Sequence, residues 1–467
     1  MNRQEAHLEY QTCEDERVAP HLGDKVALLQ ETLASHRAAL LLNRENLDIQ
    51  FNTGQVLSSL AEALLEDEAE AEARATARPL LEEAADLFAS CLAAQQREYE
   101  QMSMQWNNLQ TEQGSLPLNE VGMQTEVEDE KNTDAASEAS SAAGEWATVE
   151  EALTPEVILE TCTAQLGALT TLLGLYNPTE VSNLEKRVQE GLHTVNTSIS
   201  TLISLIDNAP PPPTIDEMAG PTLTISSSST RKEHVLTPKD DALLATTIFQ
   251  VAVAQASHRN GNLTVSEYAS TVSTLFTTLI QGSQSPEQQV AQQSAYADAL
   301  IDVAEEASAT SSDAETQWNA LSEAQKLLTQ LVKPPYNAHL SPQRLADIFD
   351  TRADMDLTRF SLSFLDAAKP AWRSSRTVLV SNAGVFYRGA KSYAERAGEG
   401  EQAKAAGAKA VVAEVLKQVL ENGDGAVAAK PEWKAQRAEV RQALEHMVNE
   451  KILGQREGEE VLRIVSQ

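Results

Sequence analysis

The stretch LDIQFNTGQVLSSLAEALLE, residues 47–66, decides the fold class. Its apolar residues recur at intervals of three and four, which predicts an amphipathic helix. Gly54 lies near the middle of this helix, where glycine costs about 1 kcal/mol relative to alanine. Such a glycine is either an unimportant surface position or a point where a second helix passes too close for any side chain. The two alternatives predict different surroundings for Gly54.

The same helical periodicity continues along the chain, and strand patterns are nearly absent. Four helix starts carry a hydroxyl residue as N-cap followed by proline in the first turn, at Thr154–Pro155, Thr237–Pro238, Ser285–Pro286 and Ser341–Pro342. We expect an all-α chain with helices at residues 24–43, 47–66, 76–110, 154–176, 179–207, 238–258, 264–282, 285–309, 313–333, 342–367, 371–398, 401–421, 431–452 and 456–466.

Two segments, 113–147 and 209–233, lack the apolar spacing that would order them. The first is acidic and rich in Ser and Ala, and the second begins with a polyproline spacer and ends in a Ser-rich linker. We expect both to be disordered loops. The predicted organisation is N-terminal helices at 1–112, an acidic loop at 113–147, a helical pair at 148–208, a Pro/Ser-rich loop at 209–236 and C-terminal helices at 237–467.

The net charge of −33 is the strongest compositional feature. Residues 368–467 hold 16 Lys and Arg against 13 Asp and Glu, so the acidity belongs to the earlier part of the chain. Such a field repels nucleic-acid phosphates and anionic membranes and attracts basic partners. The chain has no run of about 18 apolar residues, and its first twenty residues do not form a signal peptide. We expect a soluble protein of the cytoplasm, with the nucleus as a second location.

Motifs of catalysis or cofactor binding are missing from the sequence. It contains no phosphate-binding loop, nucleophile elbow, HExxH zinc motif or dinucleotide fingerprint. Its eight histidines share no metal-ligand spacing, and its three cysteines are too scattered for a disulfide framework or a metal cluster. We therefore expect neither enzymatic activity nor a cofactor or metal, and we interpret Cys91 as a buried free thiol on an apolar helix face.

The segments ENLDIQFNTGQVLSSLAE and LEEAADLFASCLAAQQ resemble the tetratricopeptide (TPR) helical repeat. Gly54 falls on the small position of the first helix of that repeat, and Leu57 follows three residues later. Ala84, Phe88 and Cys91 fall on the small, aromatic and small positions of the second helix. The resemblance implies that the small residues let paired antiparallel helices approach closely while the aromatic ring fills the groove.

The match departs from the TPR pattern in two places. Gly54 and Ala84 are 30 residues apart, which is longer than the TPR spacing of these positions, so LEDEAEAEARATARP reads as an insertion. Gln50 replaces the aromatic residue that is usual in the first helix. Weaker similarities occur at HRNGNLTVSEYASTVSTLF, with Tyr268, Val272 and Phe276 as an inward stripe, and at RADMDLTRFSLSFLDAA with SNAGVFYRGAKSYAERAG. The pattern predicts a degenerate TPR-like α-solenoid of antiparallel helix pairs with two disordered loops; the alternative is a non-repetitive helical bundle.

An acidic solenoid suits a basic client, such as a ribosomal protein or a histone. We expect an escort or assembly chaperone that is a monomer outside its complex and binds neither nucleic acid nor membrane. The alternatives are a scaffold subunit that docks through its neutral C-terminal third and, less favoured, a co-chaperone for a heat-shock chaperone. A co-chaperone of this kind would need basic residues on the concave face of its repeats. The concave positions of the best repeat are Asp48, Phe51, Asn52 and Gln55, of which only the asparagine fits.

We expect client contacts in the N-terminal half. Asp48 and Asn52 are four residues apart and share a helix face. The acidic run that follows is dense enough to create a local potential of several kT. The predicted client-binding residues are Asp48, Asn52, Glu66, Asp67, Glu68, Glu70 and Glu72. The alternative is that the acidic run is only a solvated helix face.

Overall fold

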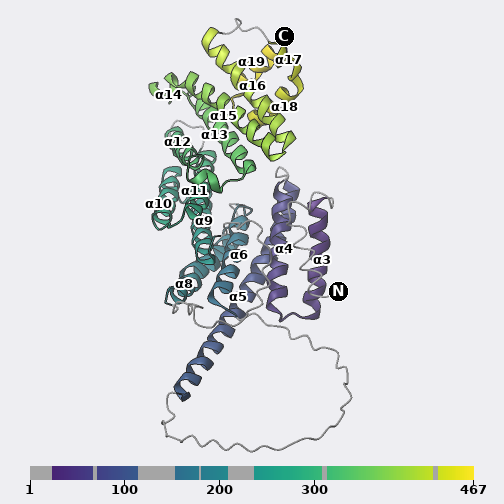
Figure 1. Ribbon diagram of the computed structural model, residues 1–467, viewed down its shortest axis with the longest axis vertical. Coiled ribbons are helices and arrows are strands. Elements are labelled where there is room, and N and C mark those ends of the chain that lie inside the picture. Colours follow the sequence, from purple (N-terminus) through teal and green to yellow (C-terminus); the bar gives the residue numbers. More distant parts are fainter. Residues whose placement is uncertain are drawn as a thin grey trace, which may run out of the picture. The chain divides into compact units, whose positions relative to one another are not determined.

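The computed structural model describes residues 24–66, 71–113, 153–177, 180–208, 236–307, 313–423 and 430–466. Helices dominate these residues, and the described ranges contain no strand (Figure 1). The prediction of an all-α chain is therefore confirmed. The two segments predicted to be disordered lie outside the described residues, except for Gln113, which is the last residue of a helix.

The chain divides into two compact units, each of which is described by itself. Unit 1 takes in Met1–Ala168 and Asn196–Pro211, and unit 2 takes in Leu169–Val195 and Pro212–Gln467. In unit 1, α3 packs on α4 and α4 packs along α5. The helices of unit 1 are α3 (Lys25–Leu42), α4 (Leu47–Glu66), α5 (Ala71–Gln113), the larger part of α6 (Pro155–Leu173), most of the π-helical turn η1 (Thr194–Ile199) and α8 (Ser200–Asp207).

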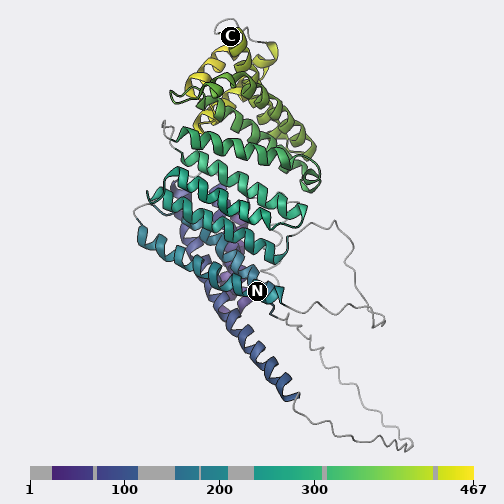
Figure 2. The same cartoon turned by 90° about the vertical axis from the view of Figure 1, so that its left-hand side faces the viewer.

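Unit 2 has a regular order of packing. Each long helix from α9 onward packs against its chain neighbour, and α9 also contacts α11. Figure 2 shows these helices stacked one on another in chain order, which is a solenoid-like arrangement. The elements that lie wholly in unit 2 are α7 (Val181–His193), α9 (Pro238–Arg259), α10 (Val265–Gln281), α11 (Pro286–Glu306), α12 (Ala314–Leu331), the 3₁₀ turn η2 (Tyr336–His339), α13 (Pro342–Leu362), α14 (Pro370–Ser374), α15 (Arg376–Ala397), α16 (Gly400–Asn422), α17 (Pro431–Ala435), α18 (Arg437–Asn449) and α19 (Gln455–Val465).

Local chemistry explains where several of these helices begin. The hydroxyls of Thr237, Ser285 and Ser341 each accept a hydrogen bond from the backbone N–H three residues on, at 3.1 to 3.2 Å. Proline follows each of the three residues, as the sequence predicts, and occupies the first turn where its missing N–H costs nothing. Ser285 and Gln288 complete a capping box, which fixes the start of α11.

Close helix approaches recur at glycines that face phenylalanines. A Cβ atom on Gly54 of α4 would lie 2.7 Å from Cε1 of Phe88 on α5. A Cβ atom on Gly389 of α15 would lie 2.8 Å from Cδ1 of Phe349 on α13, and Gly191 of α7 faces the ring of Phe249 on α9 in the same way. Gly54 is therefore a point of close approach and not a surface position.

Three predicted helices are interrupted in the structure. The single helix expected at 179–207 contains the π-helical turn η1, where the Thr194 hydroxyl donates to the Glu190 carbonyl (3.4 Å). The helix expected at 371–398 is split into α14 and α15, and at this break the Ser375 hydroxyl donates to the Trp372 carbonyl (2.8 Å). The helix expected at 431–452 is split into α17 and α18. At the first two breaks, hydroxyl side chains bond to backbone carbonyls without disturbing apolar periodicity, so periodicity alone does not predict them.

Candidate functional site

The residues that the TPR resemblance assigned to packing all lie in the interior of unit 1. Gly54, Leu57, Ala84, Phe88 and Cys91 are buried. The Phe88 ring covers Gly54 and makes an edge contact with Phe51, whose ring centroid is 5.8 Å away. These residues hold α4 against α5 and leave no group accessible to a ligand.

The described members of the set predicted to bind the client do not form one cluster. Asp48 is exposed at the start of α4 and Asn52 is half-buried one turn later. Glu66 ends the same 20-residue helix, about 27 Å from Asp48 along the axis. Glu66 lies 3.6 Å from Nζ of Lys25, and Glu72 is exposed in the first turn of α5. Asp67, Glu68 and Glu70 lie outside the described residues.

Unit 2 contains an acidic site that the sequence did not single out. Asp298, Asp302 and Glu305 follow one another on α11 at intervals of four and three, so their side chains share one face of the helix. All three are exposed. We refer to these three residues as the acidic recess.

The carboxylates of the acidic recess are accessible but poorly hydrated. The Asp298 side chain is 60% exposed, and yet desolvation by surrounding protein raises its pKa. Desolvation also raises the pKa of Asp302 to about 6, helped by repulsion from Glu305, Asp298 and Glu306. Desolvation likewise raises the pKa of Glu305, and repulsion from Glu450 adds to the shift. Neighbouring protein groups and mutual repulsion both disfavour the charged form of these carboxylates.

Cations at the edge of the acidic recess compensate only part of this charge. Arg344 of α13 lies 3.7 Å from Asp298, between Nη2 and Oδ2. Arg259 of α9 is engaged by Glu306, to which its Nε donates at 2.6 Å. Within the described part of the chain, Asp302 and Glu305 make no ion pair. The acidic recess therefore holds two carboxylates whose charge is available to a cation from outside.

The spacing of these acids is visible in the sequence, but their environment is not. A helix at 285–309 was predicted, and an acidic i, i+4, i+7 stripe on a helix is typical of a solvated face. The environment comes from other helices: α9 contacts α11, Arg344 of α13 lies beside Asp298, and Glu450 and Lys451, between α18 and α19, act on Glu305. No local pattern encodes these contacts between helices.

A second cluster of charges belongs to the core of unit 2. Lys409 of α16 is 6% exposed, and its Nζ lies 2.7 Å from Oδ2 of Asp350 and 3.1 Å from Oδ2 of Asp354 on α13. Tyr387 of α15 donates its hydroxyl hydrogen to Asp354 (2.5 Å). Burial raises the pKa of Asp354 to about 6 even though Lys409 opposes the shift. The groups satisfy one another across three helices, so we interpret this cluster as structural.

Other site chemistry is limited within the described ranges. They hold no group of three or more His, Cys, Asp and Glu side chains placed to bind a metal ion. Cys91 and Cys162 are buried, and desolvation raises the pKa of each thiol to about 12, so neither is a ready nucleophile. Of the helices described, none combines the length and the apolar character needed to cross a membrane.

Comparisons with known proteins assign no family to the chain. No family model matches the chain, and no curated protein matches it significantly. One similar solved structure is described as "Circular tandem repeat protein with novel repeat topology and enhanced subunit contact surfaces". The two chains are 11% identical. The structural alignment covers 99% of this chain and 92% of the other, with a TM-score of 0.32. Because this score is low, the helical-repeat assignment rests on the packing of sequence-adjacent helices.

Proposed function

We propose that this chain is a non-enzymatic helical-repeat protein that binds a basic protein client and escorts it as an assembly chaperone. The acidic recess is the observation that carries the proposal. Its carboxylates repel one another, and Asp302 and Glu305 make no ion pair within the described residues. A lysine or arginine side chain of a client relieves this repulsion when it enters the acidic recess.

The chemistry of the acidic recess defines the kind of client that fits it. Three carboxylates along two turns of α11 match a segment with several closely spaced cations. Lysine-rich and arginine-rich tails of ribosomal proteins and histones have this character and bind nucleic acid when they are unprotected. The net charge of −33 adds long-range steering that raises the association rate of such a client. Clients of these classes would place the protein in the cytoplasm and the nucleus.

We also propose that the helix pairs are diverged TPR units. The support is local: Gly54, on the TPR small position of the first helix, lies beneath Phe88, on the aromatic position of the second. Tyr268, Val272 and Phe276, the inward stripe of the second similarity, are all fully buried in α10. Gly261 has a φ of +74° in the turn before that helix, a conformation that suits glycine.

A binding titration tests the function. The probe is a fluorescein-labelled peptide of alternating lysine and glycine, and its fluorescence anisotropy is measured with the full chain. We expect the affinity to fall at least about tenfold between roughly 50 and 300 mM salt, because exposed charges are screened within that range. The uncharged serine–glycine peptide of equal length should not bind. Failure of the lysine peptide to bind at low salt would reject the proposal.

A scaffold role is the second candidate, and one surface feature favours it. Val378 and Val385 are seven residues apart on α15 and are 59% and 53% exposed, and Phe364 is 43% exposed. These residues lie in or beside the C-terminal part, where the charges nearly balance. A scaffold that docks through these residues would show binding that depends little on salt, which separates it from an escort.

A further inference from the structure

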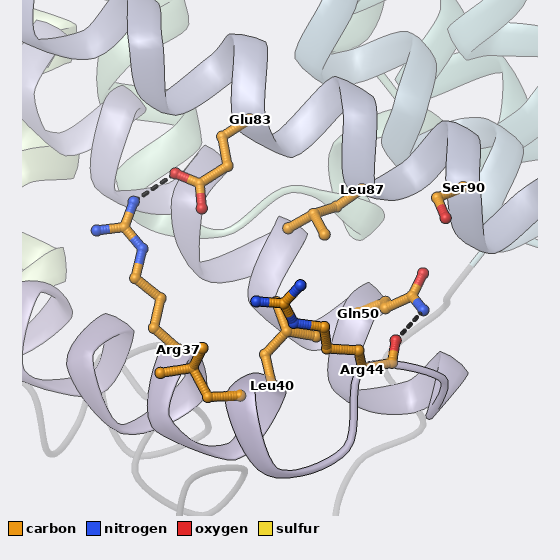
Figure 3. A pocket seen from close by; sticks show the side chains of 8 residues that line it. Arg37, Leu40, Arg44, Gln50, Glu83, Leu87 and Ser90 are labelled. Carbon is orange, nitrogen blue, oxygen red and sulfur yellow. Dashed lines mark hydrogen bonds and ion pairs between the residues drawn. The ribbon is translucent and has the colours of Figure 1, made fainter.

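A pocket in unit 1 lies between the end of α3, the start of α4 and the middle of α5 (Figure 3). Its volume is about 460 Å³, enough for one or two large side chains. All of its lining residues belong to unit 1, and none lies in the acidic recess. They are Arg37, Leu40, Leu41, Arg44, Gln50, Glu83, Leu87 and Ser90.

One part of the pocket is apolar and open. Leu40 and Leu41 come from α3 and Leu87 from α5. Leu41 is 71% exposed, and Leu42 beside it is 82% exposed, so two neighbouring leucines face solvent at the end of α3. Exposed leucines that adjoin a pocket provide apolar area for a ligand to cover.

The charged part of the pocket is basic, in contrast to the chain as a whole. Arg37 is paired with Glu83 across the pocket, as the dashed line in Figure 3 shows. Arg44 lies between Leu40 and Leu87 in the same view, and its guanidinium makes no ion pair or hydrogen bond within the described residues. The main chain of Arg44 is fixed, because Nε2 of Gln50 donates to its carbonyl oxygen at 2.6 Å. An anchored turn therefore presents an available guanidinium above an apolar surface.

We infer that this pocket binds an acidic peptide segment of a partner protein through one leucine- or phenylalanine-sized side chain and one carboxylate. The apolar side chain packs against Leu40, Leu41 and Leu87. The carboxylate pairs with Arg44, whose planar guanidinium accepts two oxygens side by side. Charge complementarity selects an acidic partner here, whereas the acidic recess selects a basic client. The two sites would let the protein hold a basic client while it contacts an acidic partner.

The test uses a labelled peptide of glutamate and glycine with one central leucine, titrated with the full chain at low salt. We expect saturable binding. Arg44→Glu should weaken it at least about tenfold, because an attractive charge pair becomes a repulsive one. Arg97→Glu is the matched control, since Arg97 is an exposed arginine of α5 outside the pocket lining; it should change the affinity by less than about twofold. Replacement of the central leucine by alanine should also weaken binding.

Folding and the other site are checked in parallel. Because Arg44 is exposed and contributes only its main-chain carbonyl to the turn, Arg44→Glu should leave the far-ultraviolet circular dichroism spectrum unchanged. The lysine–glycine peptide should bind this variant as it binds the wild type, which separates failure of this inference from failure of the proposed function. Absence of binding by the glutamate–leucine peptide, or equal affinity for the wild type and Arg44→Glu, would overturn the assignment.

Discussion

The ring of Phe88 occupies the space that a Cβ atom on Gly54 would need. The built Cβ position lies 2.7 Å from Cε1 and 2.8 Å from Cζ of that ring, closer than carbon atoms approach in a folded protein. Phe88 is 1% exposed and also contacts Phe51, so the ring has little freedom to move away. The cost of a glycine inside α4 is therefore offset by the close packing of α4 on α5.

Gly54→Ala should destabilise unit 1, even though alanine favours helix formation. We expect a loss of about 1 to 3 kcal/mol in the free energy of unfolding, because the added methyl group overpacks the interface. Urea unfolding followed by circular dichroism measures the change. Gly167→Ala on α6 is the matched control, since a Cβ atom there would meet nothing within 4 Å; it should gain up to about 1 kcal/mol. Equal effects of the two substitutions would contradict the packing role of Gly54.

Lys409→Met should destabilise unit 2 at neutral pH. Methionine has a similar length but no charge, so the half-buried Asp350 and Asp354 would face each other without a compensating cation. We expect a loss of about 3 to 5 kcal/mol near pH 7.5 in urea unfolding. Lys404→Met is the control, because Lys404 is an exposed lysine on the same helix; it should change stability by less than about 1 kcal/mol.

The penalty of Lys409→Met should shrink as the pH is lowered. The pKa of Asp354 in the folded wild type is already raised to about 6, above the usual aspartate value, and loss of Lys409 raises it further. A carboxyl group with a raised folded pKa binds its proton more tightly in the folded state, so stability falls as pH rises through that range. Unfolding of the variant measured near pH 5 should therefore show a smaller loss than near pH 7.5. Identical losses at the two pH values would argue against repulsion between the two carboxylates.

Binding of the lysine–glycine peptide should weaken as the pH falls through about 6. Asp302, with a pKa of about 6, takes up a proton in this range and loses its charge, while lysine stays protonated. The charged groups that act on Asp302 are Glu305, Asp298, Glu306 and Arg259, and the hydroxyl of Tyr268 is also near. Asp302→Asn should lower the affinity at neutral pH and flatten the pH dependence. A pH profile that Asp302→Asn leaves unchanged would assign the titration to another group.

Sequence reasoning succeeded where the controlling interactions are local. The caps at Thr237, Ser285 and Ser341 mark helix starts because a side chain and an N–H three residues apart satisfy each other. The close approach at Gly54 could be predicted because an interior glycine has a cost that packing must offset. The TPR resemblance supplied the partner position, Phe88.

The acidic recess could not be predicted in the same way. Asp298, Asp302 and Glu305 show the spacing of a common solvated face. Their pKa values are raised by desolvation and modulated by charges on α9, α13 and the turn after α18, which are distant in sequence. The denser acidic run at 66–72, in which Glu66 is paired with Lys25, led to the prediction of client contacts there, and this stays a prediction. The number of acidic residues in a short stretch of sequence gives the local charge. The pKa of each carboxyl group depends on the helices that pack around it.

The most direct test of the acidic recess compares two triple variants with the same change in net charge. One is Asp298→Asn, Asp302→Asn and Glu305→Gln. The other is Asp48→Asn, Glu66→Gln and Glu72→Gln, which neutralises the acids of α4 and α5 that the sequence suggested. All six residues are exposed, so both variants should keep the circular dichroism spectrum of the wild type.

Affinity for the lysine–glycine peptide at low salt is the measurement. Our account predicts that the acidic-recess variant binds at least about tenfold more weakly than the wild type, while the α4–α5 variant stays within about twofold. Equal weakening of both would show that overall charge attracts the peptide without a site. Selective weakening of the α4–α5 variant would place the client on the N-terminal acids and contradict the assignment to Asp298, Asp302 and Glu305.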